Sequence, residues 1–296
     1  MSISNYLKQL VNEKSKLSNT LTNMSVDNSD GTFTELVPLV CDATGNGTTK
    51  YKVNPIKFSG FTGTTLGDTL KYVDTSEQTD MDSMFANCKN LLELDLSHMD
   101  TSSATTMKNM FSYTIAVDTI DVSKFNTSNV TSMYCMFGHY GSSYGNSSTP
   151  SMFTSLPGIE NLDTSNVTNM YCTFANCDGI TELDLSSWNM ENVTTTNCMF
   201  LCSSRLKSVK LGRTSSKLTN IKSMFASAGN LDLIDMRYMD LSGVTKANAN
   251  SVFYQVRSKS YANPCKIIVK DEIAKTLLID LYPDHDIKTV EELEAE

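Results

Sequence analysis

Four aspartates recur at one position of a repeated pattern, where carboxylates could bind a cation. They are Asp95, Asp121, Asp184 and Asp235, each between the last two apolar residues of a triplet. Strands stacked about 4.8 Å apart would make Asp95 and Asp121 neighbours, and two such carboxylates can share a calcium ion. An exposed polar edge is the commoner outcome, so both stay weak metal candidates and no cofactor is expected. Lys210 has the same position in the fifth repeat and would reduce the repulsion between Asp184 and Asp235.

Three of the eight cysteines also share one repeat position, namely Cys135, Cys172 and Cys198. Stacking would bring their Cα atoms near the separation that a disulfide accepts. The cysteines lack the CxxC spacing of a zinc site and the framework of a small secreted domain, so buried free thiols are favoured. Cys88 and Cys177 share another position but belong to distant repeats.

Residues 138–150, GHYGSSYGNSSTP, form the least core-like stretch of the repeated region. Tyrosine offers contact area at low entropic cost and small polar residues adapt to a partner, a mixture that recurs in recognition loops. The receptor-binding candidates are therefore His139, Tyr140, Tyr144 and Asn146. A polar loop without a binding role is the equally weighted alternative.

Catalytic patterns are absent from the sequence. His98, His139 and His285 stand in unrelated settings, and no HExxH, GxSxG or phosphate-binding glycine loop occurs. Retaining glycoside hydrolysis needs two carboxyl groups about 5–5.5 Å apart beside a cleft. The repeated aspartates would satisfy this separation of carboxyl groups but supply no cleft, so we expect a protein that is not an enzyme. Trp188 takes the position of apolar residues in other repeats and is expected to pack in the core.

These residues are spaced by a tandem repeat. Aligned on Met-x-x-Met-Phe, the units are 26, 26, 37, 26 and 25 residues apart, and only the third is irregular. They begin at Met81, Met107, Met133, Met170, Thr196 and Ile221. The structure expected for residues 81–248 is therefore six stacked units that share one core.

Each unit has two halves. The spacing L-x-x-L-x-L, as in Leu91, Leu94 and Leu96, alternates at its end and predicts a short strand. The motif D-T-S-N-V-T-x-M-x-x-M-F places apolar residues such as Val130 and Met133 three and four apart, which predicts a short helix capped by Thr and Asn. The same apolar triplet occurs in the second unit as Val117, Ile120 and Val122, and it recurs in the fourth, fifth and sixth units.

The strings LLELDLSHMDTS…MKNMF, SKFNTSNVTSMYCMF and NLDTSNVTNMYCTF resemble the BspA-like leucine-rich repeat family of bacterial and phage surface proteins. The resemblance covers residues 70–248. It implies an α/β leucine-rich-repeat solenoid, with one short strand and one short helix per unit of about 26 residues. It also implies a module for adhesion or recognition without catalysis.

Segments on either side of the array are expected to cover it. Residues 46–80 hold an N-terminal cap and a half-repeat at Val73–Ser76. Residues 249–296 form a C-terminal cap, with a strand at 266–269 and a helix capped by Asp271. The expected apolar residues of this helix are Ile273, Leu277, Leu278 and Leu281. The acidic end, 291–296, is expected to be solvated.

Residues 1–45 do not follow the repeat. Their apolar residues are spaced by four and three, which predicts a helical seam interrupted by Lys14. The members are Ile3, Leu7, Leu10, Leu17, Leu21 and Met24. We favour an anchor or oligomerisation helix over one docked on its own protein. The string ISNYLKQLVNEKSKLSNTL…TFTELVPLV resembles N-terminal segments of virion proteins from phages of Gram-positive bacteria.

Composition limits the partners. The net charge of −9 argues against nucleic acid, and no stretch is apolar enough to insert in a membrane. No secretory signal is visible, so synthesis in a host cytoplasm is expected. The first hypothesis is a non-enzymatic virion protein of a phage, of the tail or head fibre type, that forms a homo-oligomer.

In this hypothesis the N-terminal segment binds other virion proteins and the repeats bind a glycan or protein of the host surface. A bacterial cell-surface adhesin of the same class is the alternative, although no export signal, lipid-modified cysteine or sorting tail is visible. A glycan-degrading virion enzyme is the least favoured hypothesis.

Overall fold

A computed structural model of the chain describes residues 51–52, 56–66, 70, 73–139 and 150–295. The predicted anchor residues Ile3, Leu7, Leu10, Leu17, Leu21 and Met24 lie outside the described residues. So do Tyr140, Tyr144 and Asn146, three of the four receptor-binding candidates.

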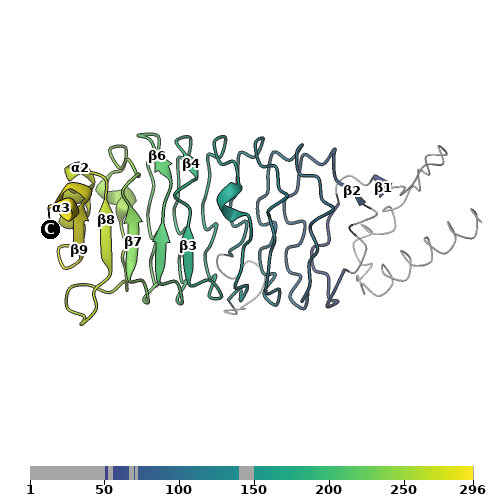
Figure 1. Cartoon of the computed structure of the whole chain (residues 1–296), viewed down its shortest axis with the longest axis horizontal. Coiled ribbons are helices and arrows are strands. Elements are labelled where there is room, and N and C mark those ends of the chain that lie inside the picture. The colour runs from purple at the N-terminus through teal and green to yellow at the C-terminus, as the bar shows by residue number, and fades with distance from the viewer. Residues whose placement is uncertain (1–50, 53–55, 67–69, 71–72, 140–149, 296) are drawn as a thin grey trace, which may run out of the picture.

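The described part is a mixed α/β structure with a five-stranded parallel sheet, few helices and no closed barrel (Figure 1). The strands are β1 (Tyr51–Lys52), β2 (Val73–Asp74), β3 (Glu182–Asp184), β4 (Asn189–Met190), β5 (Ser208–Lys210), β6 (Arg213–Thr214), β7 (Leu233–Met236), β8 (Lys266–Val269) and β9 (Asp286–Thr289). The helices are the 3-10 helices η3 (Ile159–Asn161) and η4 (Lys246–Ala249), and the α-helices α2 (Glu272–Leu281) and α3 (Val290–Glu294). The large sheet has the order β3-β5-β7-β8-β9, while β1 pairs with β2 and β4 with β6.

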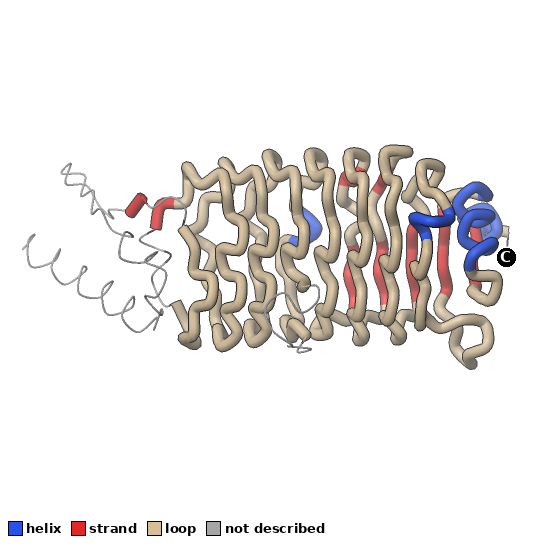
Figure 2. The backbone as a smooth tube through the Cα atoms, turned by 180° about the vertical axis from the view of Figure 1, so that it is seen from behind, coloured by secondary structure: helices blue, strands red, loops and turns tan. Residues whose placement is uncertain are grey.

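Successive repeats lie side by side along the long axis (Figures 1 and 2). Parallel bridges join one repeat position to the same position in the next unit. They are Asp80↔Thr106, Thr106↔Ser132, Ser132↔Asn169, Asn169↔Thr195 and Thr195↔Asn220. The chain therefore advances by one unit per turn, and each unit touches mainly its two neighbours.

The repeat phenylalanines form a continuous column in the core. Neighbouring ring centroids are 5.3 to 6.1 Å apart and neighbouring planes differ by 2° to 17°. The members are Phe58, Phe85, Phe111, Phe137, Phe174, Phe200, Phe225 and Phe253. The stack thus continues beyond residues 81–248 at both ends.

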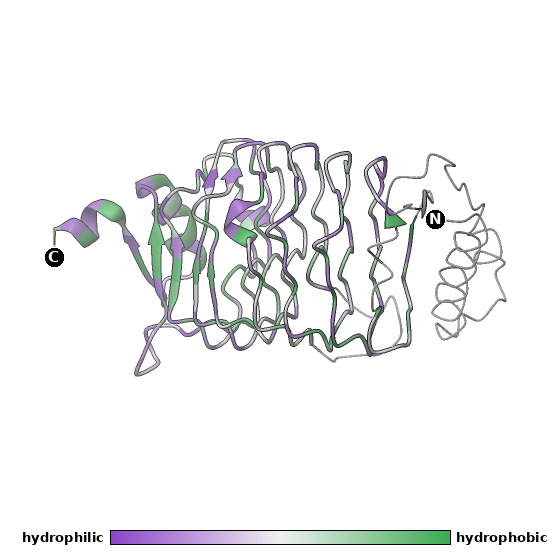
Figure 3. Ribbon diagram, turned by 45° about the vertical axis from the view of Figure 1, so that its right-hand side comes forward, coloured by the Kyte–Doolittle hydropathy of each residue, from purple (hydrophilic) through white to green (hydrophobic). Residues whose placement is uncertain are grey.

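The strands expected from the apolar triplets are present in the fourth, fifth and sixth units as β3, β5 and β7. In β3 the buried Leu183 lies between the exposed Glu182 and Asp184. Figure 3 shows hydrophobic and hydrophilic segments interspersed along the successive repeats. In the first two units the triplets make only isolated bridges, at Glu93 and Thr119.

The prediction of one short helix per unit is wrong. Ser83 and Asn109, at equivalent positions, have φ of 58° and 53°, which a right-handed helix excludes. The backbone N–H groups of Ser83 and Phe85 donate to carbonyls of the next unit at 2.8 and 2.9 Å, while that of Met84 donates within its own turn, to Met81. The apolar residues of the motif, spaced three and four apart, are therefore the inward-facing residues of successive tight turns.

The Thr and Asn residues before these turns do not cap helices either. The Thr101 hydroxyl donates to the Asn126 carbonyl of the next unit at 3.0 Å and accepts from the Asn126 N–H at 2.8 Å. Thr75 and Asp100 make the same pair of bonds. The D-T-S-N motif therefore joins neighbouring units.

The C-terminal strand and helix are confirmed. Strand β8 spans the predicted residues, and the Asp271 carboxylate caps α2 by accepting from the Ala274 N–H at 3.0 Å. Leu278 is buried, whereas Ile273 is 62% exposed and does not join the core. Strand β9 and α3 were not anticipated, and Glu292 of α3 pairs with Lys275.

Replacing Phe200 with Ala tests the aromatic column. The ring is fully buried between Phe174 and Phe225, so its loss should lower the free energy of unfolding by about 3–5 kcal/mol. Urea denaturation monitored by circular dichroism measures the change. Leu92→Ala, at a side chain 56% exposed, is the control and should change it by less than about 0.5 kcal/mol. Equal effects of the two variants would contradict the column as the core.

Candidate functional site

On the strand side of the described part, the backbone hydrogen bonds between repeats are interrupted between 91–97 and 117–123 and again between 152–158 and 180–186. Residues 154–157 pair with the second unit: Ile120 and Val122 donate to the carbonyls of Ser155 and Pro157 at 3.1 and 2.9 Å. On their other side lies β3, which is the edge strand of the five-stranded sheet. Among the described residues, no backbone hydrogen bond joins 152–158 to 180–186.

The opening is closed at both ends. At one end the Gly179 N–H donates to the Ser151 carbonyl at 3.2 Å, beside the bridge Ser151↔Cys177. At the other end the Trp188 indole Nε1–H donates to the Ile159 carbonyl at 2.8 Å. Trp188 is buried, as the prediction of a packing role requires.

Pro157 and Gly158 end the extended segment of the third unit. Pro157 has no N–H to donate to a strand. Gly158 has φ of 83°, and a Cβ there would lie 2.3 Å from the Cα of Ser123, so only glycine fits. Helix η3 follows at once, and Ser187 holds it by donating to the Glu160 carbonyl at 2.7 Å. These residues lead the chain out of the ladder before β3 begins.

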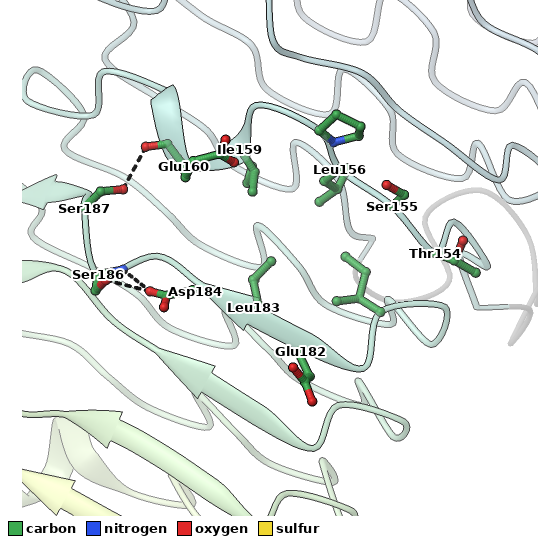
Figure 4. A pocket seen from close by; sticks show the side chains of 12 residues that line it. Thr154, Ser155, Leu156, Ile159, Glu160, Glu182, Leu183, Asp184, Ser186 and Ser187 are labelled. Carbon is green, nitrogen blue, oxygen red and sulfur yellow. Dashed lines mark hydrogen bonds between the residues drawn. The ribbon is translucent and has the colours of Figure 1, made fainter.

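The result is a cavity of about 570 Å³, within the range of ligand-binding pockets (Figure 4). Its lining residues are Thr154, Ser155, Leu156, Pro157, Ile159, Glu160, Ile180, Glu182, Leu183, Asp184, Ser186 and Ser187. Buried apolar side chains make the floor, and exposed hydroxyls and carboxylates make the rim. The lining contains no basic and no aromatic residue.

Asp184 is the best-defined carboxylate of the rim. The Lys210 ammonium lies 2.8 Å from it, and the Ser186 hydroxyl donates at 2.6 Å. The hydrogen bond from Lys210, then that from Ser186, lowers the pKa of Asp184 to about 2. Asp184 therefore stays ionised, and Lys210 lies beside it as the sequence predicts. Asp235, by contrast, is only 5% exposed and pairs with Arg237, so it is not at an exposed edge.

The weak metal candidates Asp95 and Asp121 have a local role. Each carboxylate accepts from the backbone N–H two residues later, Ser97 at 3.0 Å and Ser123 at 2.9 Å. The hydrogen bonds from Ser123 lower the pKa of Asp121. Within the described ranges, no three His, Cys, Asp or Glu side chains are grouped to hold a metal ion.

Cys135, Cys172 and Cys198 do come together, as the repeat predicts. They form one buried cluster, and the seven cysteines in the described part are free thiols. Burial raises the pKa of Cys172 strongly, and a hydrogen bond from Cys172 lowers the pKa of Cys198. The stacked rings of Tyr134 and Tyr171, 4.9 Å apart, pack beside this cluster.

His139 does not fit a receptor-binding role. Its side chain is 3% exposed, and its ring stacks on Tyr113 with centroids 4.1 Å apart. His139 therefore belongs to the core.

Sequence reasoning missed the pocket residues Glu160 and Glu182. The available signal was the third unit itself, which has no L-x-x-L-x-L triplet and carries Pro157-Gly158 in its place. The fold and the opening together define a repeat protein with a lateral pocket beside β3.

Within that class the family is defined by sequence. Residues 57–155 and 148–236 match the family described as "Mycoplasma protein of unknown function, DUF285", a BspA-like repeat family, and the chain belongs to it. No curated protein and no solved structure matches the chain. No helix in the described part is long and apolar enough to cross a membrane.

Lys210→Met tests the electrostatics of the rim. The pKa of Asp184 should rise from about 2 toward the usual value of about 3.9, which carboxyl-carbon NMR titration measures. Because the folded-state pKa is lowered, the stabilisation is present above about pH 4 and is lost as the pH falls through about 2. Lys207→Met, at a second exposed lysine, should leave the titration unchanged. An unaltered midpoint in Lys210→Met would refute the pairing.

Proposed function

We propose that the chain is a non-catalytic recognition protein: a BspA-like leucine-rich-repeat solenoid that binds its ligand in the pocket between the third and fourth units. The repeat length of about 26 residues falls in the range of this repeat class. The observation that carries the proposal is the cavity at the open edge of β3, where no backbone hydrogen bond joins the strand to the described residues 152–158.

The pocket chemistry supports binding over catalysis. A glycosidase acid needs a raised pKa so that it is protonated at neutral pH. Asp184 has the opposite shift, since Lys210 and Ser186 hold it ionised. The aspartates of the first two units are held in turns by Ser97 and Ser123.

For its setting we propose a phage virion, in which the N-terminal segment assembles with other virion proteins as a homo-oligomer and the repeats attach to a host-surface glycan or protein. The heptad spacing of residues 1–45 and their resemblance to virion proteins support this setting. The second candidate is a bacterial cell-surface adhesin, and the Mycoplasma protein in the family description supports only its bacterial source.

Fractionation separates the two settings. If the virion proposal holds, mass spectrometry finds the chain in gradient-purified particles, in constant ratio to the major structural proteins. Recovery of the chain only in the cell envelope would reject the virion proposal and favour the adhesin.

Filling the pocket tests recognition. The exposed Ser155 lines the pocket, so Ser155→Trp should reduce binding of the fluorescently labelled protein to intact host cells at least tenfold. Glu93→Trp is the matched control, because Glu93 is also exposed and holds the equivalent strand position in the first unit. Flow cytometry measures both, after circular dichroism has shown that both variants fold. Equal binding by the two variants would contradict the proposed site.

A further inference from the structure

We infer that the pocket between the third and fourth units binds an extended, basic peptide segment of a partner protein, which pairs its backbone with the free edge of β3. The inference rests on the proposed function and names the ligand class of that same site.

The first argument is the pairing of β3. This strand has β5 on one side only, in parallel register from Glu182↔Ser208 to Asp184↔Lys210. A strand with a single neighbour carries N–H and C=O groups along its other edge that no strand satisfies. An extended peptide can supply the missing partner, as in β-strand addition.

The second argument is the register of the repeat. Thr119 is bridged to Ser155, and Glu182 is bridged to Ser208, all in parallel. The series is interrupted between Glu93 and Thr119 and again between Ser155 and Glu182, and the cavity occupies the second interval. The cavity therefore lies along the open edge of β3, where a parallel strand would continue the pairing of β3 with β5.

The third argument is the size of the interval. Its ends are fixed by the bond from Gly179 to Ser151 and by the bond from Trp188 to Ile159. At about 3.3 Å per residue, the lining segment 154–157 spans on the order of 13 Å. The site therefore accepts about four residues of an extended chain, and the rest of the partner must lie outside it.

Charge defines the side chains of that segment. The rim carries Glu160, Glu182 and Asp184, and no lysine, arginine or histidine lines the cavity. Lys210, which contacts the rim, is already paired with Asp184. An incoming segment gains most from lysine or arginine side chains that point to this rim.

The apolar floor of the cavity favours a bound segment in which two kinds of side chain alternate. Leu156 and Leu183 face the cavity from buried positions (Figure 4), and the buried Ile180 also lines it. Successive side chains of a strand point to opposite sides. A segment in which apolar and basic residues alternate therefore places its apolar side chains on the floor and its cations at the rim.

A sugar ring fits these features less well. The lining has no aromatic side chain on which a ring could stack, and the nearby Trp188 is 1% exposed with its indole N–H bonded to Ile159. The unpaired backbone edge is matched by a polypeptide, which offers donors and acceptors at strand spacing.

Fluorescence anisotropy with labelled six-residue peptides tests the inference on the full-length chain. A peptide of alternating valine and lysine should bind, and a peptide of alternating valine and glutamate should bind at least tenfold more weakly. N-methylation of alternate residues of the valine–lysine peptide keeps its charge and removes N–H donors along one edge, and should weaken binding at least tenfold.

Two variants locate the binding. Glu182→Lys should weaken binding of the valine–lysine peptide at least tenfold, whereas Glu191→Lys makes the same charge change at an exposed residue outside the cavity lining and should leave it within twofold. Equal weakening by the two variants would indicate general charge attraction and overturn the inference. Full binding of the N-methylated peptide would overturn strand pairing.

Failure of the inference can be told from failure of the proposed function. If Ser155→Trp abolishes cell binding but no valine–lysine peptide binds, recognition by the pocket stands and the peptide inference falls. Binding of glycan fragments released from the host surface, lost in Ser155→Trp, would likewise replace the peptide with a sugar.

Discussion

The structure depends on backbone hydrogen bonds that join each unit to the next. In the turns that carry the core phenylalanines, the backbone N–H groups alternate between their own unit and its neighbour. Phe174 donates to Met199 at 2.9 Å and Phe200 to Met224 at 2.8 Å. Buried backbone groups without partners are strongly unfavourable, so a single unit cannot fold alone. The aromatic column follows, because bonds at this spacing hold successive rings in stacking contact.

Side-chain hydrogen bonds explain why a buried threonine recurs in the repeat motif. The buried Thr101 hydroxyl both donates to and accepts from Asn126 in the next unit, and Thr75 does the same with Asp100. One hydroxyl thus satisfies two backbone groups that would otherwise lack partners. The repeated polar positions are occupied by this structural task, so a binding role must be sought where the pattern is broken.

The sequence predicts the period, the strands of the last three units and the Asp271 cap, because each depends on residues close in the chain. It misleads on the helices, since the inward positions of the turns have helix-like spacing. The left-handed φ of Ser83 is enforced by bonds to the next unit and is not encoded by residue type. The pocket escapes prediction for a related reason: Pro157 signals an irregular strand, but the separation from β3 depends on how two distant segments meet.

The missing backbone hydrogen bonds beside β3 cost free energy, and neighbouring hydrogen bonds to η3 offset that cost. Each backbone bond missing beside β3 would have contributed about 0.5–1.5 kcal/mol, while Trp188 and Ser187 make compensating bonds to η3. Exposed strand edges also invite association with other chains. Here the edge is flanked by Glu182 and Asp184 on a chain of net charge −9, which disfavours pairing with a second copy of itself. The same charges favour a basic partner, so one feature both protects the edge and selects what can add to it.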